Sequence, residues 1–167
     1  LSLALGASLQ ILGTGLFVAG IVGEALPVIM IVPMLFLASS IMAFTTGTSF
    51  GTFAMMIPIG VPLIQMLGLP PAFVISAILG GGVFGDHCSP ISDTTIMTAT
   101  STNMVHQEHV DTQVTYALPV IVVTGISFLL CGYLISYTNA IYSILISYLT
   151  AFFVGMKYFI FKKRATI

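Results

Sequence analysis

No lysine or arginine occurs before Lys157, although the same stretch of chain contains five carboxylates. Almost every other residue there is apolar, so an ionised Asp or Glu has no cationic side chain to pair with. A lone charge is costly in a medium of low dielectric constant, and it must find a proton, a cation, water or fixed dipoles. Asp86 and Asp93 lie in one short polar interruption between apolar stretches. This arrangement is typical of a membrane protein that handles cations.

The composition predicts an all-α polytopic membrane protein. Hydrophobic residues make up 57% of the chain and charged residues 5%, whereas roughly 25% of an ordinary soluble domain is charged. Several apolar stretches approach the roughly 20 residues that a helix needs to cross a bilayer. The basic cluster Lys162, Lys163 and Arg164 directly follows the last stretch and favours a cytoplasmic C-terminus. Cys88 and Cys131 lie in apolar or mid-membrane sequence, and a disulfide between them is the less favoured interpretation.

The order of the apolar stretches predicts the organisation of the chain. Leu1 opens an apolar stretch with no methionine, charged n-region or small-residue cleavage site, so we expect part of a longer transporter and no signal peptide. A transporter repeat is expected over 1–136, an additional transmembrane helix over 139–161 and a basic cytoplasmic tail at 162–167. Within the repeat we expect spans at about 1–22, 26–44 and 113–136, and re-entrant segments or half-helices at 45–69 and 72–102. The tight turn 137–139 would be external, and the polar loop 103–112 cytoplasmic.

Two polar segments interrupt the apolar sequence at membrane depth. Residues 45–52 include two glycines and five hydroxyl side chains, and both a hairpin tip and an unwound helix fit this composition. The apolar stretch 72–83 is too short to span, and Pro90 forces Ser89 away from helical geometry. The sequence therefore predicts two half-helices that meet at 86–95. Such breaks survive in a bilayer only where they are buried or face water, and they are typical of ion sites in secondary transporters.

Asp86 and Asp93 are the main candidates for ion and proton binding. On one continuous helix they would lie roughly 10 Å apart along the axis, but a turn at Pro90 can fold Asp93 back towards Asp86. Ser89 and Ser92 lie between them and supply hydroxyl oxygens, which hard cations accept as ligands. Two carboxylates in one poorly hydrated site resist simultaneous ionisation, so one of them can exchange a proton for a cation.

Three further residues are candidates for the same site. Thr48 and Ser49 offer uncharged oxygens from the first polar segment, and His87 offers a proton relay or a hydrogen-bond partner for a carboxylate. Each has a structural alternative, since hydroxyls also satisfy broken backbone and a lone histidine is more often structural. Asp93 likewise can serve only as the N-cap of the second half-helix.

A membrane-embedded metalloenzyme is the weakest alternative. His87, Cys88, His106 and His109 are ligands of the type that zinc accepts. However, His106 and His109 fall in the predicted aqueous loop, away from the break, and their spacing matches neither common histidine motif of zinc enzymes. We therefore expect a solvated connector at this loop, and no metal and no other cofactor in the protein.

Two motifs resemble those of the NhaC-type Na⁺/H⁺ antiporters of bacteria. They are Thr46-Gly47-Thr48-Ser49-Phe50-Gly51-Thr52 and Gly85-Asp86-His87-Cys88-Ser89-Pro90-Ile91-Ser92-Asp93-Thr94-Thr95, and the similarity extends over about 3–136. The resemblance implies membership of the ion-transporter superfamily, which is built from two inverted repeats with broken or re-entrant helices. This chain would then be the C-terminal half of such a transporter in a bacterial cell membrane, and the N-terminal half would be missing.

The expected function is Na⁺/H⁺ antiport, with Asp86 as the main carboxylate and Asp93 as a second ligand or a cap. Because the family also includes exchangers of organic acids, a Na⁺- or H⁺-coupled exchanger of organic anions or amino acids is the alternative. The expected partners are Na⁺, H⁺, membrane lipid and the missing N-terminal half, with no nucleic acid; whether the transporter is a homodimer stays open. The chain alone is expected to exchange no ions, because half of its site would be absent.

Overall fold

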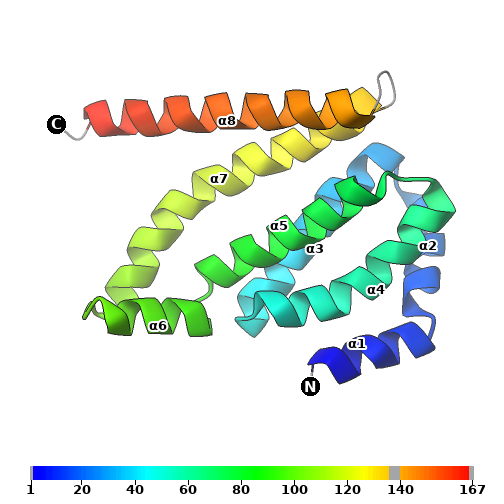
Figure 1. Ribbon diagram of the computed structural model, residues 1–167, viewed down its shortest axis with the longest axis horizontal. Helices are drawn as coiled ribbons and strands as arrows, with labels where there is room; N and C mark the ends of the chain where they lie inside the picture. Colours follow the sequence, from blue (N-terminus) through cyan, green and yellow to red (C-terminus); the bar gives the residue numbers. More distant parts are fainter. Residues whose placement is uncertain (1, 136–139, 166–167) are drawn as a thin grey trace.

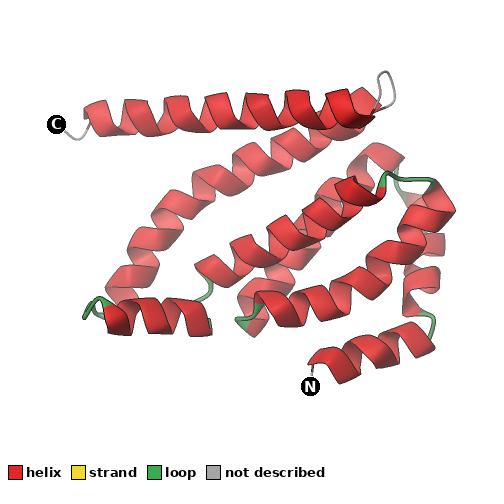
Figure 2. Cartoon of the chain, in the orientation of Figure 1, coloured by secondary structure: helices red, strands yellow, loops and turns green. Residues whose placement is uncertain are grey.

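The computed structural model describes residues 2–135 and 140–165, and every regular element in this part of the chain is a helix (Figure 1). Figure 2 shows short loops between most of these helices. The prediction of an all-α fold is confirmed, whereas the predicted turn at 137–139 lies outside the described residues. The helices are, in order, α1 (Ser2–Ile11), α2 (Thr14–Ala25), α3 (Val28–Thr46), α4 (Ser49–Leu67), α5 (Pro71–Cys88), α6 (Asp93–Ser101), α7 (His106–Ile135) and α8 (Ala140–Ala165).

Several helices are long and apolar enough to cross a membrane. Among the described residues, α3, α4, α5 and α7 meet this condition, and the pair α1 and α2 counts as one further span if its two bent parts act together. The pair bends by 67°, and Gly13 at the bend adopts a left-handed conformation with a φ of 66°. The single span expected over 1–22 is therefore broken. In α8, which packs on α7 (Figure 1), the apolar part is Leu145–Tyr158.

Three boundaries differ from the prediction. The expected half-helix at 72–83 is wrong, because α5 continues through the glycine run Gly80–Gly82 as one helix of 18 residues. The segment 45–69 is also no half-helix, since α3 ends at Thr46, Gly47 and Thr48 form a turn, and α4 then runs for 19 residues. The loop expected at 103–112 is shorter, because α7 begins at His106 and the carbonyl of Val105 accepts the amide of His109 at 3.1 Å.

Glycines bring α3 and α5 close together. A Cβ atom at Gly81 would contact the carbonyl oxygen of Phe36, and a Cβ atom at Gly85 would contact the carbonyl oxygen of Ser40. Residues four apart on one helix thus meet residues four apart on the other, so the two helices run in the same direction (Figure 1). Small residues allow this approach of backbones in membrane helices. The glycine run is therefore a packing surface rather than a helix end.

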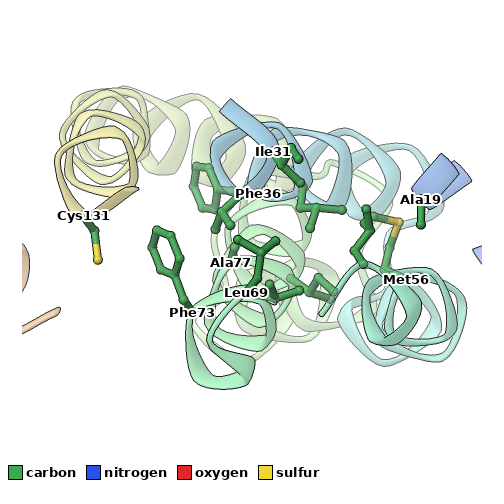
Figure 3. Close-up of a cluster of buried hydrophobic side chains, with 13 residues drawn as sticks. Ala19, Ile31, Phe36, Met56, Leu69, Phe73, Ala77 and Cys131 are labelled. Carbon is green, nitrogen blue, oxygen red and sulfur yellow. The ribbon is translucent and has the colours of Figure 1, made fainter. Parts of the chain in front are cut away.

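The apolar core lies where α3, α4 and α5 meet, as Figure 3 shows. Phe36 from α3 is almost fully buried and lies 5.3 Å from the ring of Phe128 in α7, between ring centroids. The ring of Phe73 from α5 lies 5.7 Å from Phe128 by the same measure. These contacts fix α5, and with it the polar residues at the C-terminal end of α5.

Candidate functional site

The second polar break separates α5 from α6. Asp86 lies in the last turn of α5, and its carbonyl oxygen accepts the amide of Ser89 at 3.1 Å. Ser89 and Ser92 both have extended backbone, with φ and ψ of −76° and 126° and of −70° and 134°. Ser92 is the N-cap residue of α6, and Asp93 occupies the first helical position. The break thus spans the few residues around Pro90, as the sequence predicts, but Asp86 itself is helical.

The Asp86 carboxylate is buried, and two hydroxyl oxygens lie within hydrogen-bond distance of it. Its exposed fraction is 5%. Ser92 Oγ donates to Asp86 Oδ1 at 2.8 Å, and Thr94 Oγ1 lies 3.4 Å from Asp86 Oδ2. The two hydroxyl oxygens also lie 2.8 Å from each other. Because each hydroxyl has a single hydrogen, the arrangement with the shorter distances is a chain in which Thr94 donates to Ser92 and Ser92 donates to Asp86.

The charge of Asp86 has no basic counterpart in the sequence before Lys157. Hydrogen bonding by these hydroxyls offsets only part of the cost of taking a carboxylate out of water. A proton neutralises such a group, and so does a small cation held by the carboxylate and the nearby hydroxyl oxygens. The site can therefore hold a proton or a cation, and the same oxygens serve both.

Contacts from two other helices hold the break in place. Ser89 Oγ donates to the carbonyl oxygen of Phe44 in α3 at 2.7 Å. Gly47, in the turn after α3, packs so closely that a Cβ atom there would lie 2.8 Å from the carbonyl oxygen of Ile91. His106 Nε2, at the start of α7, lies 2.7 Å from the carbonyl oxygen of Pro90. His106 was expected away from the break, and that expectation is wrong because α7 begins directly beside it.

The other predicted residues lie at or near the break with different partners. Asp93 is exposed, so the turn brings Ser92 and Thr94 against Asp86 while the second carboxylate stays at the surface. His87 is exposed, and its Nδ1 lies 3.1 Å from the carbonyl oxygen of Val83. In the first break, Thr48 is the N-cap of α4 and accepts the amide of Gly51 at 3.3 Å, and Ser49 is half-buried in the first turn.

Thr94 was not among the predicted site residues. A sequence feature that could have identified Thr94 is the pair of hydroxyl residues on either side of Asp93, in the run Ser92-Asp93-Thr94. Ser92 is buried and Thr94 is exposed, but the hydroxyl oxygens of both reach the Asp86 carboxylate, at 2.8 Å and 3.4 Å. In the part of the chain that the structure describes, no three His, Cys, Asp or Glu side chains lie close enough together to hold a metal ion.

Membrane-length helices around a buried carboxylate at a helix break are features of a polytopic helical membrane transporter. The Na⁺/H⁺ antiporter family matches residues 1–133. The chain therefore belongs to this family, and the resemblance seen in the two polar motifs is confirmed. No solved structure matches the chain.

Two curated relatives support this assignment. An uncharacterized protein of Haemophilus influenzae is 40% identical over 124 residues, which cover 72% of this chain and 23% of the relative. The malate-2H⁺/Na⁺-lactate antiporter of Bacillus subtilis is 37% identical over 99 residues, which cover 57% of this chain and 20% of the relative. The chain thus spans about a fifth to a quarter of the length of the curated relatives it matches. The family supports cation-coupled antiport in general and a membrane location.

Proposed function

We propose that this chain is part of a secondary transporter that exchanges Na⁺ for H⁺, with Asp86 binding the two ions in turn. The observation that supports this most is the buried Asp86 carboxylate with two hydroxyl partners and no basic residue earlier in the sequence than Lys157. An ion pair with Lys or Arg would fix the charge of the carboxylate. Within this chain, a proton or a cation that arrives and leaves can balance the charge instead.

The exchange step follows from the chemistry of the site. When Asp86 is protonated, the carboxylic acid is neutral and tolerates burial. When Na⁺ arrives, the proton leaves and the carboxylate binds the cation together with the lone pairs of Ser92 Oγ and Thr94 Oγ1. A hard cation takes about six oxygen ligands, so carbonyl oxygens and water complete the shell. Proton and Na⁺ then exclude each other because they use the same oxygen atoms.

The remaining candidates receive supporting roles in this proposal. Ser89 positions the break through its bond to Phe44, and Thr48 and Ser49 support the turn that packs against it. Asp93 acts on the exposed N-terminal turn of α6, where a negative charge is favourable. His87 lies next to the carboxylate in sequence and borders the space in front of it.

The proposed protein is larger than this chain. Because the relatives are four to five times longer than the matched segments, we infer that the chain is one part of a larger transporter. The family resemblance implies an inverted-repeat transporter of a bacterial cell membrane, with this chain in its C-terminal half. The basic residues Lys162, Lys163 and Arg164 favour a cytoplasmic C-terminus. The chain expressed alone should show no exchange in membrane vesicles, and full activity of the isolated chain would contradict the need for a second half.

The central test is the Asp86→Asn variant of the complete transporter. Asn keeps the size of the side chain but can neither release a proton nor carry a negative charge. We expect Na⁺-dependent dissipation of a pH gradient in everted vesicles to disappear, while the matched variant Asp93→Asn keeps most of it. Undiminished exchange by Asp86→Asn would remove Asp86 from the mechanism.

A second candidate function is the exchange of an organic anion coupled to Na⁺ or H⁺. It is favoured by the name of the Bacillus subtilis relative, which includes malate and lactate as well as Na⁺ and H⁺. Uptake of labelled malate and lactate into the same vesicles separates the two functions. Uptake that depends on a Na⁺ gradient, with no exchange in the absence of an organic acid, would favour the second.

A further inference from the structure

A polar pocket lies in front of the Asp86 site, between the end of α5, α6 and the first half of α7. Its volume is about 470 Å³, large enough for a cation with several of its water molecules. Its lining contains two imidazoles, an amide, a phenol and four hydroxyls, and neither a carboxylate nor a lysine or arginine. The lining residues are His87, Thr94, Thr95, Thr98, His109, Thr112, Gln113 and Tyr116.

Two of the four threonine hydroxyls in this lining already donate their hydrogen to the backbone. Thr98 Oγ1 donates to the carbonyl oxygen of Thr94 at 2.7 Å, and Thr112 Oγ1 donates to that of Glu108 at 2.9 Å. A hydroxyl has one hydrogen and two lone pairs, so each of these oxygens has only lone pairs left to offer. The bond from His87 Nδ1 to the carbonyl oxygen of Val83 requires the hydrogen on Nδ1, which leaves a lone pair on Nε2 of the neutral ring.

Two further oxygens of the lining lack partners. Among the described residues, Thr95 Oγ1 and Gln113 Oε1 are buried atoms without a hydrogen bond. Thr95 is only 3% exposed, so water reaches it poorly from outside. An amide oxygen accepts and never donates. The pocket therefore offers lone pairs from Thr98, Thr112 and His87 to a cation.

Thr94 joins the pocket to the carboxylate. It lines the pocket, and its hydroxyl oxygen lies 2.8 Å from Ser92 Oγ and 3.4 Å from Asp86 Oδ2. We propose that the pocket is an entry site, where a partly hydrated monovalent cation binds before it passes Thr94 to reach Asp86. The inference rests on the proposed function, since it assigns the approach to the same site. A lining without a formal negative charge suits a single positive charge that must leave again.

The first test compares hydroxyls inside and outside the pocket. Thr98→Val and Thr112→Val remove one pocket oxygen each. Thr100→Val and Thr115→Val remove hydroxyls that bond to backbone carbonyls in the same way, at 2.8 Å each, but do not line the pocket. We expect the pocket variants to raise the Na⁺ concentration at half-maximal exchange about fivefold, with an unchanged maximal rate. Equal effects of all four variants would overturn the proposal.

The second test needs no transport activity. A single cysteine at Thr98 in the complete transporter is labelled with a cationic or an anionic methanethiosulfonate of similar size, and Thr100→Cys is the control. We expect the cationic reagent to react about tenfold faster at position 98 relative to the control, and Na⁺ to slow it. Protection by Na⁺ in a protein that shows no Na⁺/H⁺ exchange would support the entry site while contradicting the proposed function. Preference for the anionic reagent, or no protection by Na⁺, would overturn the entry site.

Discussion

The two polar breaks are similar in composition but use their hydroxyls differently. Around the first break, the hydroxyls of Thr45 and Thr46 both donate to the carbonyl oxygen of Met42, at 2.9 Å and 2.8 Å. Thr52 donates to the carbonyl oxygen of Thr48 at 3.0 Å, and Thr48 caps α4. At the second break, Ser92 and Thr94 point their hydroxyls at a carboxylate. The first break therefore satisfies its own backbone, and the second forms a polar site.

The difference shows that hydroxyl content alone does not identify an ion site. What distinguishes the second break is Asp86, which needs the hydroxyls as donors. The two breaks also touch, through Gly47 against Ile91 and through the bond from Ser89 to Phe44. The first break thus supports the second by packing against it.

The largest effect is expected where α3 and α5 pack. Gly85→Ala places a Cβ atom against the carbonyl oxygen of Ser40, which is backbone and cannot move aside. We expect a loss of about 3 kcal/mol in the free energy of unfolding. Gly80→Ala is the matched control, because a Cβ atom there lies 3.8 Å from the Phe36 ring, at ordinary contact distance. Thermal unfolding in detergent measures both, and equal stability of the two variants would contradict the close packing.

The next effect tests the contact between the breaks. Gly47 and Gly68 both adopt left-handed backbone, with φ of 66° and 64°, so alanine at either costs about 1 kcal/mol in strain. At Gly68 no neighbouring atom lies within 4 Å, whereas at Gly47 the new Cβ atom would press on Ile91. Gly47→Ala should therefore cost about 2 kcal/mol more than Gly68→Ala. It should also weaken Na⁺ binding, and an unchanged Na⁺ dependence would show that the first break does not support the site.

The third prediction concerns the proposed ion site at Asp86. Ser92→Ala removes the hydroxyl that donates to Asp86 and offers a lone pair to a cation. Hydrogen bonds to charged groups are the stronger ones, so we expect the Na⁺ concentration at half-maximal exchange to rise about tenfold. Ser49→Ala, at the first break, should change it less than about twofold. Similar shifts for both variants would mean that the two breaks share the ion.

The sequence predicts the fold class and the position of the second polar break. Apolar composition and length identify the spans, Pro90 identifies the second break, and the missing basic residues identify Asp86 as unusual. Ser92 is also recovered as a neighbour of Asp86. These features depend on residue types and on the spacing of residues close together in the chain. Both can be taken directly from the sequence.

The helix boundaries and the identity of the turn residues that reach Asp86 were not predictable in the same way. From the sequence alone, the glycine run of α5 indicates a helix end. In the structure it is a packing surface, because the backbone of Phe36 and Ser40 lies against α5. Likewise, the extended dihedral angles of Ser89 and Ser92 decide that Thr94, rather than Asp93, reaches Asp86. The helix boundary depends on packing partners from another helix, and the turn depends on backbone dihedral angles. Neither can be derived from a single sequence.

The smallest effect is expected at the cap of α4. Thr48→Ala removes the oxygen that accepts the amide of Gly51, and the loss of such a cap costs about 1 kcal/mol. Thr48→Ser keeps the oxygen and should restore most of that stability. Because this hydroxyl serves the backbone, the Na⁺ dependence of exchange should stay unchanged in both variants. If Thr48→Ala instead shifts the Na⁺ dependence as far as Ser92→Ala does, and Thr48→Ser restores it, then the first break also binds the cation and the division of roles is wrong.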